Sequence, residues 1–345
     1  MGRRRYNRHM PRICIVPRVV GSGGMASFRM KFEDGLQQRG IEVTYQPDAS
    51  ADALLVIGGT RRLLPLWRAR NRGVRVVQRL DGINWVQRVR WSGLRYTVRA
   101  EYGNALLALI RARLADRVVY QSEFIRRWWQ DWYGKVQAPG QVILNGVDLK
   151  VFSPHGESAQ RLDRFRLLVV EGSLTGGLDT GLHAAVQLAE HLAQNLPVRL
   201  TVAGKVDERA RNRLARSSQV PVEFLGIVPR DQIPGLLRAS DLLFSAEINP
   251  PCPNAVIEAL ACGLPVVGFD TGSLKELVVG DAGRLVPYGG DPWKLTPPDV
   301  PALAAAALEI LQQPERSRKA ARLQAEESLG LDVMVEAYLH VLLEG

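Results

Sequence analysis

The chain of 345 residues alternates short apolar runs with segments of helical periodicity, and it does so twice. The predicted strands are Ile13–Val16, Ile41–Tyr45, Ala53–Ile57, Val74–Gln78, Arg117–Tyr120, Val142–Leu144, Phe165–Val170, Val198–Ala203, Val222–Leu225, Asp241–Ser245, Pro265–Phe269 and Arg284–Val286. The predicted helices between them are Ala26–Arg39, Arg61–Arg72, Arg95–Ala115, Ser122–Tyr133, Asp179–Gln194, Asp207–Arg216, Arg230–Ala239, Asn254–Cys262 and Leu274–Val279. Because strand and helix alternate, each half is expected to form a parallel sheet with helices on both faces. The predicted fold class is α/β, with two doubly wound domains facing each other.

The domain boundaries are expected where the composition turns polar. Residues 1–155 form the first predicted domain and 161–313 the second, joined by the polar segment Ser153–Gln160. Residues 314–345 are expected to form helices that pack back on the body. In the last of these, polar residues recur at every fourth position, so one narrow stripe faces water and the rest is covered. The stripe consists of Asp332, Glu336, His340 and Glu344.

The charge of the chain is unevenly distributed. Residues 1–160 carry 27 Lys and Arg against 12 Asp and Glu, a net charge of +15, while residues 161–345 carry 18 against 23, a net charge of −5. Six of the seven Trp also lie in the first part. A basic, Trp-rich half suggests an anionic partner, such as a phosphorylated ligand, a membrane surface or nucleic acid, although a merely soluble basic face is the alternative. Arg-Trp surfaces dock on anionic membranes, and peripheral membrane association is therefore expected ahead of nucleic-acid binding.

The cysteines and the apolar segments indicate where the chain resides. Three Cys, an odd number without paired spacing, are interpreted as buried free thiols in a reducing compartment. The basic N-terminal stretch is too short and too interrupted for a signal peptide, and no apolar run is long enough to cross a bilayer. The expected location is cytoplasmic, with peripheral attachment at the inner face of the membrane. No metal-binding pattern is found.

Glycines and a helix start mark the predicted site at the carboxyl ends of the strands, where open parallel sheets bind ligands. Gly23 and Gly24 follow the first strand and allow backbone N–H groups to approach phosphate, or they form a simple tight turn. In the segment NPPCPNAVIEALACGLPVVGFDTGS, Asn254 is expected to cap a helix and leave its first N–H groups for an anion. Glu258, one turn later, is expected either to accept hydrogen bonds from the vicinal hydroxyls of a ribose or to form a salt bridge with a neighbouring basic residue. Lys205 follows a buried strand and is expected either to neutralise phosphate or to be a surface lysine at the start of a helix.

The stretch PCPNAVIEALACGLPVV resembles the donor-binding motif of the GT-B retaining enzymes called glycosyl transferases group 1. Further similar segments are VVYQSEF, LNGVDLKVFSP, FLGIVPRDQIPGLLRASDLLFSAE and FDTGSLKELV, in the same order, so that the resemblance covers nearly the whole chain. It implies two Rossmann-like domains with a cleft between them and a nucleotide-sugar donor held mainly by the second domain. It also implies transfer with retained configuration and without a metal.

The resemblance assigns roles to individual residues. Glu258 matches the glutamate that holds the ribose of the donor. The other residues that match donor-binding positions are Asn254, Ala255 and Val256 for sugar and phosphate, Lys205 and Val228 for base or phosphates, and Gly23 and Gly24 for the glycine loop. No cofactor is implied besides the co-substrate, a UDP-, GDP- or ADP-linked sugar.

The chain departs from the family pattern at three places. Pro250 stands where a first glutamate is usual, and Glu247, three residues earlier, is the candidate substitute. The loop from Glu171 to Thr180 lacks the usual Arg and Lys, and Gly176 and Gly177 are expected to donate N–H groups instead. Asp81 replaces a histidine that contacts the donor sugar. Three cations near sheet edges are candidates to replace the missing ones, namely Arg79, Lys205 and Arg284.

These residues predict a glycosyltransferase that moves a sugar from a nucleotide-diphosphate sugar to a hydroxyl acceptor, with Asp81 and Glu247 as catalytic candidates. The expected acceptor is a glycan or a lipid-linked molecule in cell-surface polysaccharide or glycolipid synthesis. Because stabilisation of the leaving diphosphate is a large part of such catalysis, the missing cations also leave an alternative open. In that alternative the protein is a catalytically weakened, glycosyltransferase-like protein that binds nucleotide sugars.

Overall fold

The computed structural model describes residues 10–21, 23–47, 50–91, 93–159, 164–174 and 179–344. The chain divides into two compact units, each with its own parallel sheet. The first unit comprises Met1–Gln87, Ser92–Gly146 and Leu331–Gly345, and the second comprises Arg88–Trp91 and Val147–Gly330. Residues 153–159 of the predicted linker thus belong to the second unit, where the Arg238 guanidinium donates to the carbonyl oxygens of Ser153 and Glu157.

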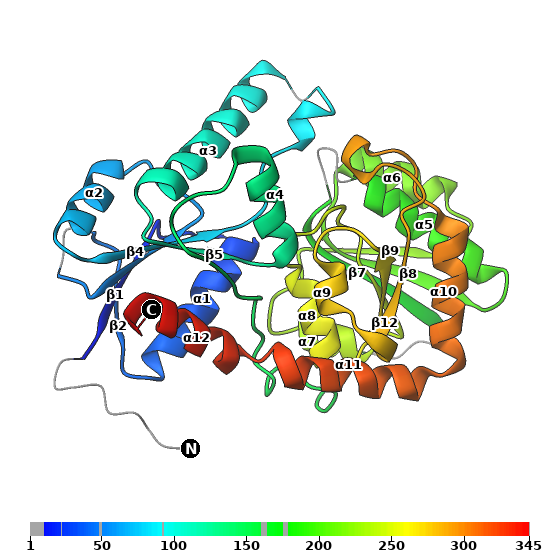
Figure 1. The fold of residues 1–345 in the computed structure, drawn as a ribbon. Coiled ribbons are helices and arrows are strands. Elements are labelled where there is room, and N and C mark those ends of the chain that lie inside the picture. Colours follow the sequence, from blue (N-terminus) through cyan, green and yellow to red (C-terminus); the bar gives the residue numbers. More distant parts are fainter. Residues whose placement is uncertain are drawn as a thin grey trace. The chain divides into compact units, whose positions relative to one another are not determined.

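The first unit contains a six-stranded sheet in the order β2-β1-β3-β4-β5-β6, with every neighbouring pair parallel. Its strands are β1 (Arg12–Val16), β2 (Glu42–Thr44), β3 (Ala53–Ile57), β4 (Arg75–Leu80), β5 (Arg117–Tyr120) and β6 (Gly140–Val142). Its helices are α1 (Gly24–Gln37), α2 (Leu63–Asn71), α3 (Leu94–Arg113), α4 (Glu123–Tyr133), α12 (Leu331–Leu339) and the short terminal turn η4 (His340–Glu344) (Figure 1). A further turn, η1 (Val86–Arg88), precedes α3.

Alternate residues of the same strands feed two separate cores, because successive side chains of a strand point to opposite faces. On one face, Ile13 and Ile15 pack with Phe28 and Phe32 of α1 and with side chains of α12. On the other face, the intervening residues of β1 and β3 pack with α2 and α3, in a cluster that includes Leu66 of α2. This double burial is what makes the strands appear in the sequence as unbroken apolar runs.

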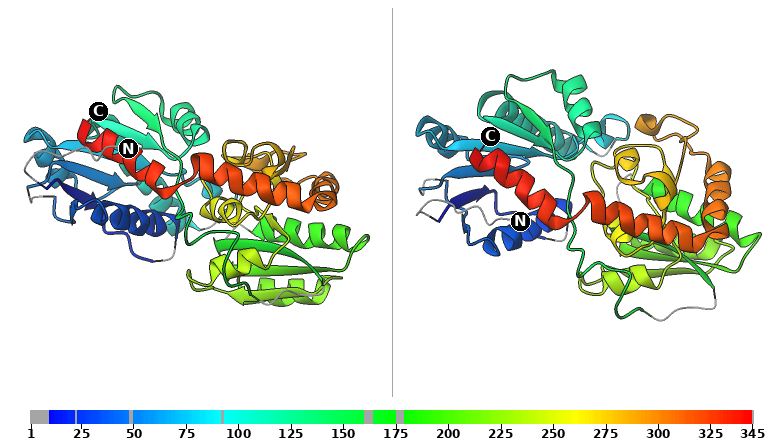
Figure 2. Two further views of the ribbon diagram at one scale, coloured as in Figure 1. Left: turned by 90° about the horizontal axis from the view of Figure 1, so that it is seen from below. Right: turned by 60° about the horizontal axis from the view of Figure 1, so that its bottom comes forward.

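The last helix completes the first unit although it ends the chain. Tyr338 of α12 packs against the rings of Phe28 and Phe32, with centroids 5.1 and 5.2 Å away. Arg39 pairs with Asp332 and Glu336, two residues of the predicted polar stripe. The preceding helix, α11 (Pro314–Ser328), belongs to the second unit and packs on α8 (Asn254–Ala261) there (Figure 2).

The second unit repeats the plan with the strand order β12-β11-β10-β7-β8-β9. Its strands are β7 (Phe165–Ser173), β8 (Val198–Lys205), β9 (Val222–Gly226), β10 (Leu242–Phe244), β11 (Val266–Phe269) and β12 (Gly283–Val286). Besides α8 and α11, its helical elements are α5 (Asp179–Ala193), α6 (Glu208–Ser217), α7 (Ile233–Arg238), α9 (Leu274–Leu277), η2 (Gly280–Ala282), η3 (Pro292–Lys294) and α10 (Val300–Gln312). All neighbouring strands are again parallel.

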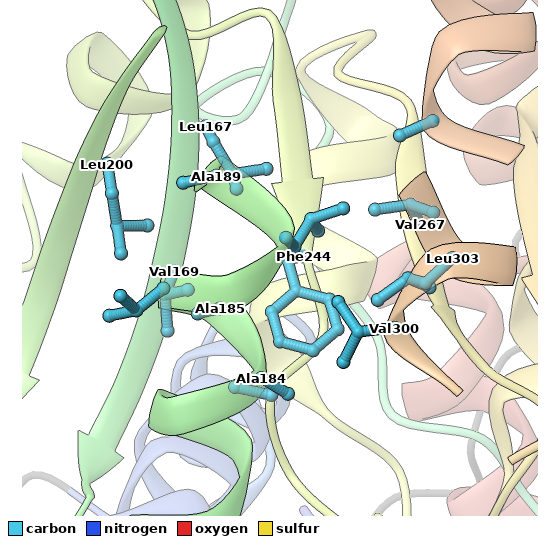
Figure 3. Packing of buried hydrophobic residues seen from close by; sticks show 14 of the residues in the cluster. Leu167, Val169, Ala184, Ala185, Ala189, Leu200, Phe244, Val267, Val300 and Leu303 are labelled. Atoms are coloured by element: carbon cyan, nitrogen blue, oxygen red, sulfur yellow. The ribbon is translucent and has the colours of Figure 1, made fainter. Parts of the chain in front are cut away.

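One face of this sheet is closed by α5 and α10 (Figure 3). The alanines Ala184, Ala185 and Ala189 on α5 let the helix approach the strands closely, while Val300 and Leu303 on α10 fill the space beside Phe244. The core therefore combines small and large residues of α5 with large residues of the strands, a combination that packs to high density.

The structure confirms the predicted fold class, and each of the predicted strands is present. The predicted Val142–Leu144 strand lies two residues earlier, as β6, and α10 was not predicted. Cys14, Cys252 and Cys262 are buried and form no disulfide, as expected. Within the described part of the chain, no helix has the length and apolar character needed to cross a membrane.

Candidate functional site

The second sheet reverses its strand order between β7 and β10. From β7 the chain builds outward through β8 and β9, then crosses to β10 and continues on the other side through β11 and β12. In an open parallel sheet, the loops that leave the carboxyl ends of the strands diverge at such a point and create a ligand site. The loops after β7, β8, β10 and β11 are therefore expected to border a ligand site.

Two glutamates meet at this point. Glu171 lies near the end of β7, and Glu247 follows β10, the neighbouring strand. The Glu171 carboxylate accepts a hydrogen bond from the backbone N–H of Glu247. Burial raises the pKa of Glu247 to about 7, and burial together with the nearby charge of Glu247 raises the pKa of Glu171 well above its usual value. The carboxyl pair can therefore hold a proton near neutral pH, so that it both donates and accepts hydrogen bonds.

Glycines let the loops at this edge approach one another. A Cβ at Gly204, at the end of β8, would overlap the carbonyl oxygen of Glu171. A Cβ at Gly181 in the first turn of α5 would overlap the carbonyl oxygen of Ala246, and one at Gly272 would overlap Pro250. These contacts fix the backbone on both sides of Glu247. The loop after β10 also contains Asn249, whose φ of 55° is uncommon for a residue other than glycine.

Three buried polar atoms in the loops that follow β10 and β11 have no hydrogen-bond partner in the described structure. They are Oγ of Ser245, Nδ2 of Asn249 and Oγ of Ser273, whose residues are 5%, 4% and 0% exposed. An unpartnered buried polar group costs about 1–3 kcal/mol, so several of them in adjoining loops call for an explanation. A polar ligand that supplies hydrogen bonds is one such explanation.

The helix α8 begins beside these loops, but its cap differs from the prediction. Pro253 occupies the N-cap position and Asn254 is the first helical residue, with no side chain capping the helix. The prediction that Asn254 caps α8 is wrong, because the Pro-rich loop remains extended up to Pro253. The first intrahelical bond runs from the N–H of Ile257 to the carbonyl of Pro253, 3.3 Å. The N–H groups of the preceding turn thus lack an intrahelical partner and favour an anion.

Glu258 lies four residues after Asn254 on α8, and is 9% exposed. Asn254 and Ala255 are half-buried and Val256 is buried. The structure therefore brings together on one short helix the predicted phosphate cradle (Asn254, Ala255 and Val256) and the predicted ribose ligand. Positions four apart lie on the same side of a helix, one turn deeper.

The cations proposed as replacements have different surroundings. Lys205 is the last residue of β8 at the carboxyl edge, is exposed, and has no ion-pair partner among the described residues. The prediction that Arg284 can replace a missing cation is wrong, because Arg284 lies at the amino end of β12 and pairs with Asp281 and Glu309. A further lysine, Lys275, lies in the single turn of α9 at the carboxyl edge and pairs with Asp270.

Two further predictions concern the loops after β7 and β9. Gly176 and Gly177 lie outside the described residues, so their predicted N–H donors stay a prediction. Val228 lies, half-buried, in the loop after β9, which is at the same edge of the sheet as Lys205.

The first unit has its own reversal of strand order, between β1 and β3. Gly23 is the N-cap of α1 and Gly24 its first residue, both exposed. The backbone of Gly23 has φ −78°, and a Cβ there would meet no atom of the described chain within 4 Å. Neither backbone conformation nor packing within the chain therefore requires a glycine at position 23. The close approach of a ligand remains as a reason.

Asp81 follows β4 and is held by a buried network in the first unit. Nη1 of Arg79, a residue only 1% exposed, donates to Oδ1 of Asp81, and its Nη2 donates to Oδ1 of Asn145, 3.0 Å. Gln121 hydrogen-bonds to the Asp81 carboxylate, and Trp129 donates to the Asp81 carbonyl. Burial raises the pKa of Asp81 in spite of Arg79. Arg79 is thus committed to Asp81, which removes it as a candidate for neutralising a diphosphate.

The second unit also has a surface depression of about 650 Å³ lined by Gln187, His191, Gln219 and Pro298, among others. The depression is lined in part by the carboxyl-terminal half of α5, the helix that precedes β8. The depression therefore lies at the amino edge of the sheet, opposite the carboxyl pair, and contains none of the predicted site residues.

Comparisons with known proteins point to one family. Residues 166–313 match the family described as Glycosyl transferases group 1. The chain is 30% identical over 218 residues, 61% of its length, to a GDP-mannose-dependent alpha-(1-6)-phosphatidylinositol dimannoside mannosyltransferase of Mycobacterium tuberculosis (strain ATCC 25177 / H37Ra). It spans 53% of that relative, about half of its length.

Two solved structures share the fold over almost the whole chain. The sucrose-phosphate synthase of Thermosynechococcus elongatus has a TM-score of 0.74 at 17% identity, covering 96% of this chain and 98% of its own. HepE of Anabaena, crystallised with UDP-glucose, has a TM-score of 0.70 at 17% identity, covering 97% and 99%. At such identities the likeness shows the fold.

Proposed function

We propose that the chain is a glycosyltransferase, because residues 166–313 match the family described as Glycosyl transferases group 1 and the two units have the Rossmann-like plan of the GT-B fold. The proposed reaction moves a sugar from a nucleoside-diphosphate sugar to a hydroxyl of an acceptor, with retention of configuration and without a metal. The donor is placed in the second unit, at the reversal of strand order between β7 and β10.

The uncapped start of α8 supports the placement of the diphosphate. Three backbone N–H groups at Asn254, Ala255 and Val256 have no partner within the helix, and the helix dipole favours negative charge there. Glu258 is one turn deeper and is proposed to accept hydrogen bonds from the two ribose hydroxyls. Lys205, exposed and without an ion pair among described residues, is proposed to neutralise phosphate from the next loop.

The carboxyl pair is proposed to hold the transferred sugar. A diphosphate next to Glu171 and Glu247 would be repelled, whereas sugar hydroxyls can donate to a carboxylate and accept from a carboxylic acid. The buried and unpartnered Ser245 and Asn249 flank Glu247 in the sequence and add further hydrogen-bonding capacity. Glu247 is therefore proposed as the substitute for the glutamate that Pro250 replaces.

The proposed chemistry requires no covalent bond to the protein. The acceptor oxygen forms a bond to the anomeric carbon while the bond from that carbon to the leaving phosphate oxygen breaks. The acceptor proton passes to the leaving phosphate oxygen on the same face of the sugar. The protein contributes fixed dipoles and cations that stabilise the growing charge on the diphosphate, the kind of contribution that is worth about 3–4 kcal/mol per donor. Asp81 of the first unit, whose carboxylate accepts from Arg79, is proposed as a hydrogen-bond acceptor for a sugar hydroxyl.

The observation that carries this proposal is the uncapped α8 with a buried Glu258 one turn into it, inside the segment that matches the family. The test is calorimetry with UDP-, GDP- and ADP-linked sugars and with the free diphosphates. The relative's name includes GDP-mannose and the HepE structure contains UDP-glucose, so both are in the panel.

Glu258→Gln is expected to weaken binding of the preferred ligand roughly tenfold to 100-fold, since two charge-assisted hydrogen bonds lose strength. Glu327→Gln, a change of the same chemistry at an exposed site on α11, is the control and should leave affinity unchanged. Failure of every nucleotide ligand to bind the folded wild-type chain would contradict the proposal.

A second candidate function is a nucleotide-sugar binding protein with weakened turnover. The observation that favours it is Pro250 at the position of the first glutamate, together with the commitment of Arg79 to Asp81. Release of nucleoside diphosphate in the presence of glycan and glycolipid acceptors separates the two candidates. Binding without release, across donors and acceptors, would favour the second.

The acceptor is proposed to be a glycan or a lipid-linked molecule, as in cell-surface polysaccharide or glycolipid synthesis. The name of the mycobacterial relative gives its acceptor as a phosphatidylinositol dimannoside. Thin-layer separation of lipid extracts after incubation with labelled donor distinguishes a lipid product from a soluble glycan.

A further inference from the structure

We propose that the outward side of α2 and α3 in the first unit is a docking surface for a bilayer with anionic headgroups. The surface, called here the α2–α3 surface, consists of the exposed residues of those two helices and of Arg61 and Arg62 before α2 (Figure 1). The inference concerns only the first unit and is independent of the proposed donor site.

An apolar stripe runs along the exposed side of α3. Leu94, Val98, Tyr102 and Leu109 are 67%, 59%, 52% and 45% exposed. At about 100° per residue, these four positions fall within an arc of about 80°, and Ala105 and Ala112, also exposed, lie within the same arc. The stripe is therefore continuous over about 27 Å of helix. The inward side of α3, by contrast, packs Ile110 into the core.

Arginines form one margin of the stripe. Arg95, Arg99 and Arg113 are exposed, and none forms an ion pair with a described residue. No Asp or Glu is among the exposed residues of α3, because its one acidic residue, Glu101, is half-buried and accepts hydrogen bonds from Gln87 and Asn104. Positive charge beside an exposed apolar stripe is the pattern of a helix that lies in a membrane interface.

The helix α2 extends the same pattern. Leu64 and Trp67 are 53% and 51% exposed, and Arg61, Arg62 and Arg68 are exposed around them. The guanidinium of Arg61 lies over the ring of Tyr102, 5.7 Å from its centroid, so the start of α2 is beside the middle of α3. Tryptophan and tyrosine at the level of lipid headgroups are typical of proteins that contact bilayers.

The charges decide between the possible occupants of this surface. A second copy of the chain, joined through the same face, would place arginines opposite arginines. A nucleic acid would match the arginines but leave the Leu94–Val98–Leu109 stripe without an apolar partner. An anionic bilayer offers phosphates and acyl chains in one plane, and so satisfies both features.

The test is flotation of the full-length protein with phosphatidylcholine vesicles, with and without phosphatidylglycerol, in the absence of nucleotide sugar. Three Arg-to-Gln changes at Arg95, Arg99 and Arg113 are expected to weaken binding to the anionic vesicles roughly 100-fold, at about fivefold per arginine. The same number of changes on α6, at Arg209, Arg213 and Arg216, is the matched control. These arginines are exposed on a helix without large exposed apolar residues, and their loss should leave binding nearly unchanged.

A second variant tests the apolar part. Leu94→Ser with Leu109→Ser removes no charge and alters only exposed positions, so circular dichroism should show an unchanged fold, and vesicle binding should fall at least tenfold. Three results would each overturn the proposal. The first is that the α6 control loses as much vesicle binding as the α3 variant. The second is that the wild-type chain does not float with anionic vesicles. The third is that the chain forms a dimer without vesicles and the Leu-to-Ser variant abolishes this dimer. Since no donor is present, none of these results bears on glycosyl transfer.

Discussion

The carboxyl pair at the switch point of the second sheet should make the stability of the protein depend on pH in a specific way. Burial raises the pKa of Glu247 to about 7, from an ordinary value of 4.5. A carboxyl group whose pKa is raised on folding binds its proton more tightly in the folded state than in the unfolded state. The folded state is therefore penalised as the pH rises from 4.5 to 7, because the unfolded chain loses this proton first.

The size of the penalty follows from the shift. One pKa unit corresponds to about 1.4 kcal/mol, so a shift of about 2.5 units costs up to ~3 kcal/mol above pH 7. Glu247→Gln keeps the shape of the side chain and removes the titration. The free energy of unfolding of this variant, relative to wild type, should rise by about 2–3 kcal/mol between pH 5 and pH 8. Glu171→Gln should act in the same direction, because the pKa of Glu171 is also raised.

The assay is urea denaturation followed by circular dichroism at several pH values between 5 and 8. Glu327→Gln, at an exposed site of α11 without an ion pair among described residues, is the control and should follow wild type at every pH. If Glu247→Gln and wild type change in parallel across this range, Glu247 does not carry a raised pKa. The interpretation of the pair as a neutral-pH proton holder for sugar hydroxyls would then be refuted.

Three other substitutions and one chemical modification test separate parts of the structure. Arg79→Met should lower the free energy of unfolding of the first unit by about 3–5 kcal/mol, because it removes the buried cation that pairs with Asp81 and donates to Asn145; thermal denaturation measures this, and a loss under 1 kcal/mol would contradict it. Gly204→Ala should destabilise the second unit, since its Cβ would overlap the Glu171 carbonyl, whereas Gly23→Ala, whose Cβ meets no described atom within 4 Å, should keep the melting temperature. Burial raises the pKa of Cys262 to about 12, so iodoacetamide at pH 8 should modify this thiol only after unfolding, as mass spectrometry can show.

The strands could be predicted because the fold makes them distinctive. A strand covered on both faces needs apolar residues at every position, and runs such as Ala53–Ile57 have no other interpretation at that length. The exception is β6, an edge strand whose first residues, Gly140 and Gln141, are exposed and carry no apolar signal. The helix α10 was not predicted, although its start carries two typical signals in the sequence. Asp299 caps it by accepting from the N–H of Ala302, and Pro301 lies in its first turn.

The site was predictable only where its parts are close in the sequence. Asn254 and Glu258 are on one helix, so their relation follows from helical geometry. The relation of Glu171 to Glu247 depends on β7 and β10 being neighbours in the sheet, and no local pattern contains that information. From the sequence alone, Glu171 is only the first residue of a loop without cations. In the same way, the sequence shows only that Arg79 is a cation near a sheet edge. Its hydrogen bonds to Asp81 and Asn145 depend on β4, β5 and β6 being neighbours in the sheet.

The residues substituted in the main tests of the two proposals lie in different units, and this gives a strict test of both. Glu258 is on α8 of the second unit, and the arginines Arg95, Arg99 and Arg113 are on α3 of the first. Substitutions without shared partners have additive effects to within about 0.5 kcal/mol. Glu258→Gln should thus leave vesicle binding unchanged, and the Arg-to-Gln variant should leave donor affinity in solution unchanged. Transfer to a soluble acceptor should depend only on the first of these changes, whereas transfer to a lipid acceptor in vesicles should depend on both. If the arginine variant lost donor affinity in solution, the positive charge on α3 would belong to the donor site and the assignment of the α2–α3 surface to the bilayer would have to be withdrawn.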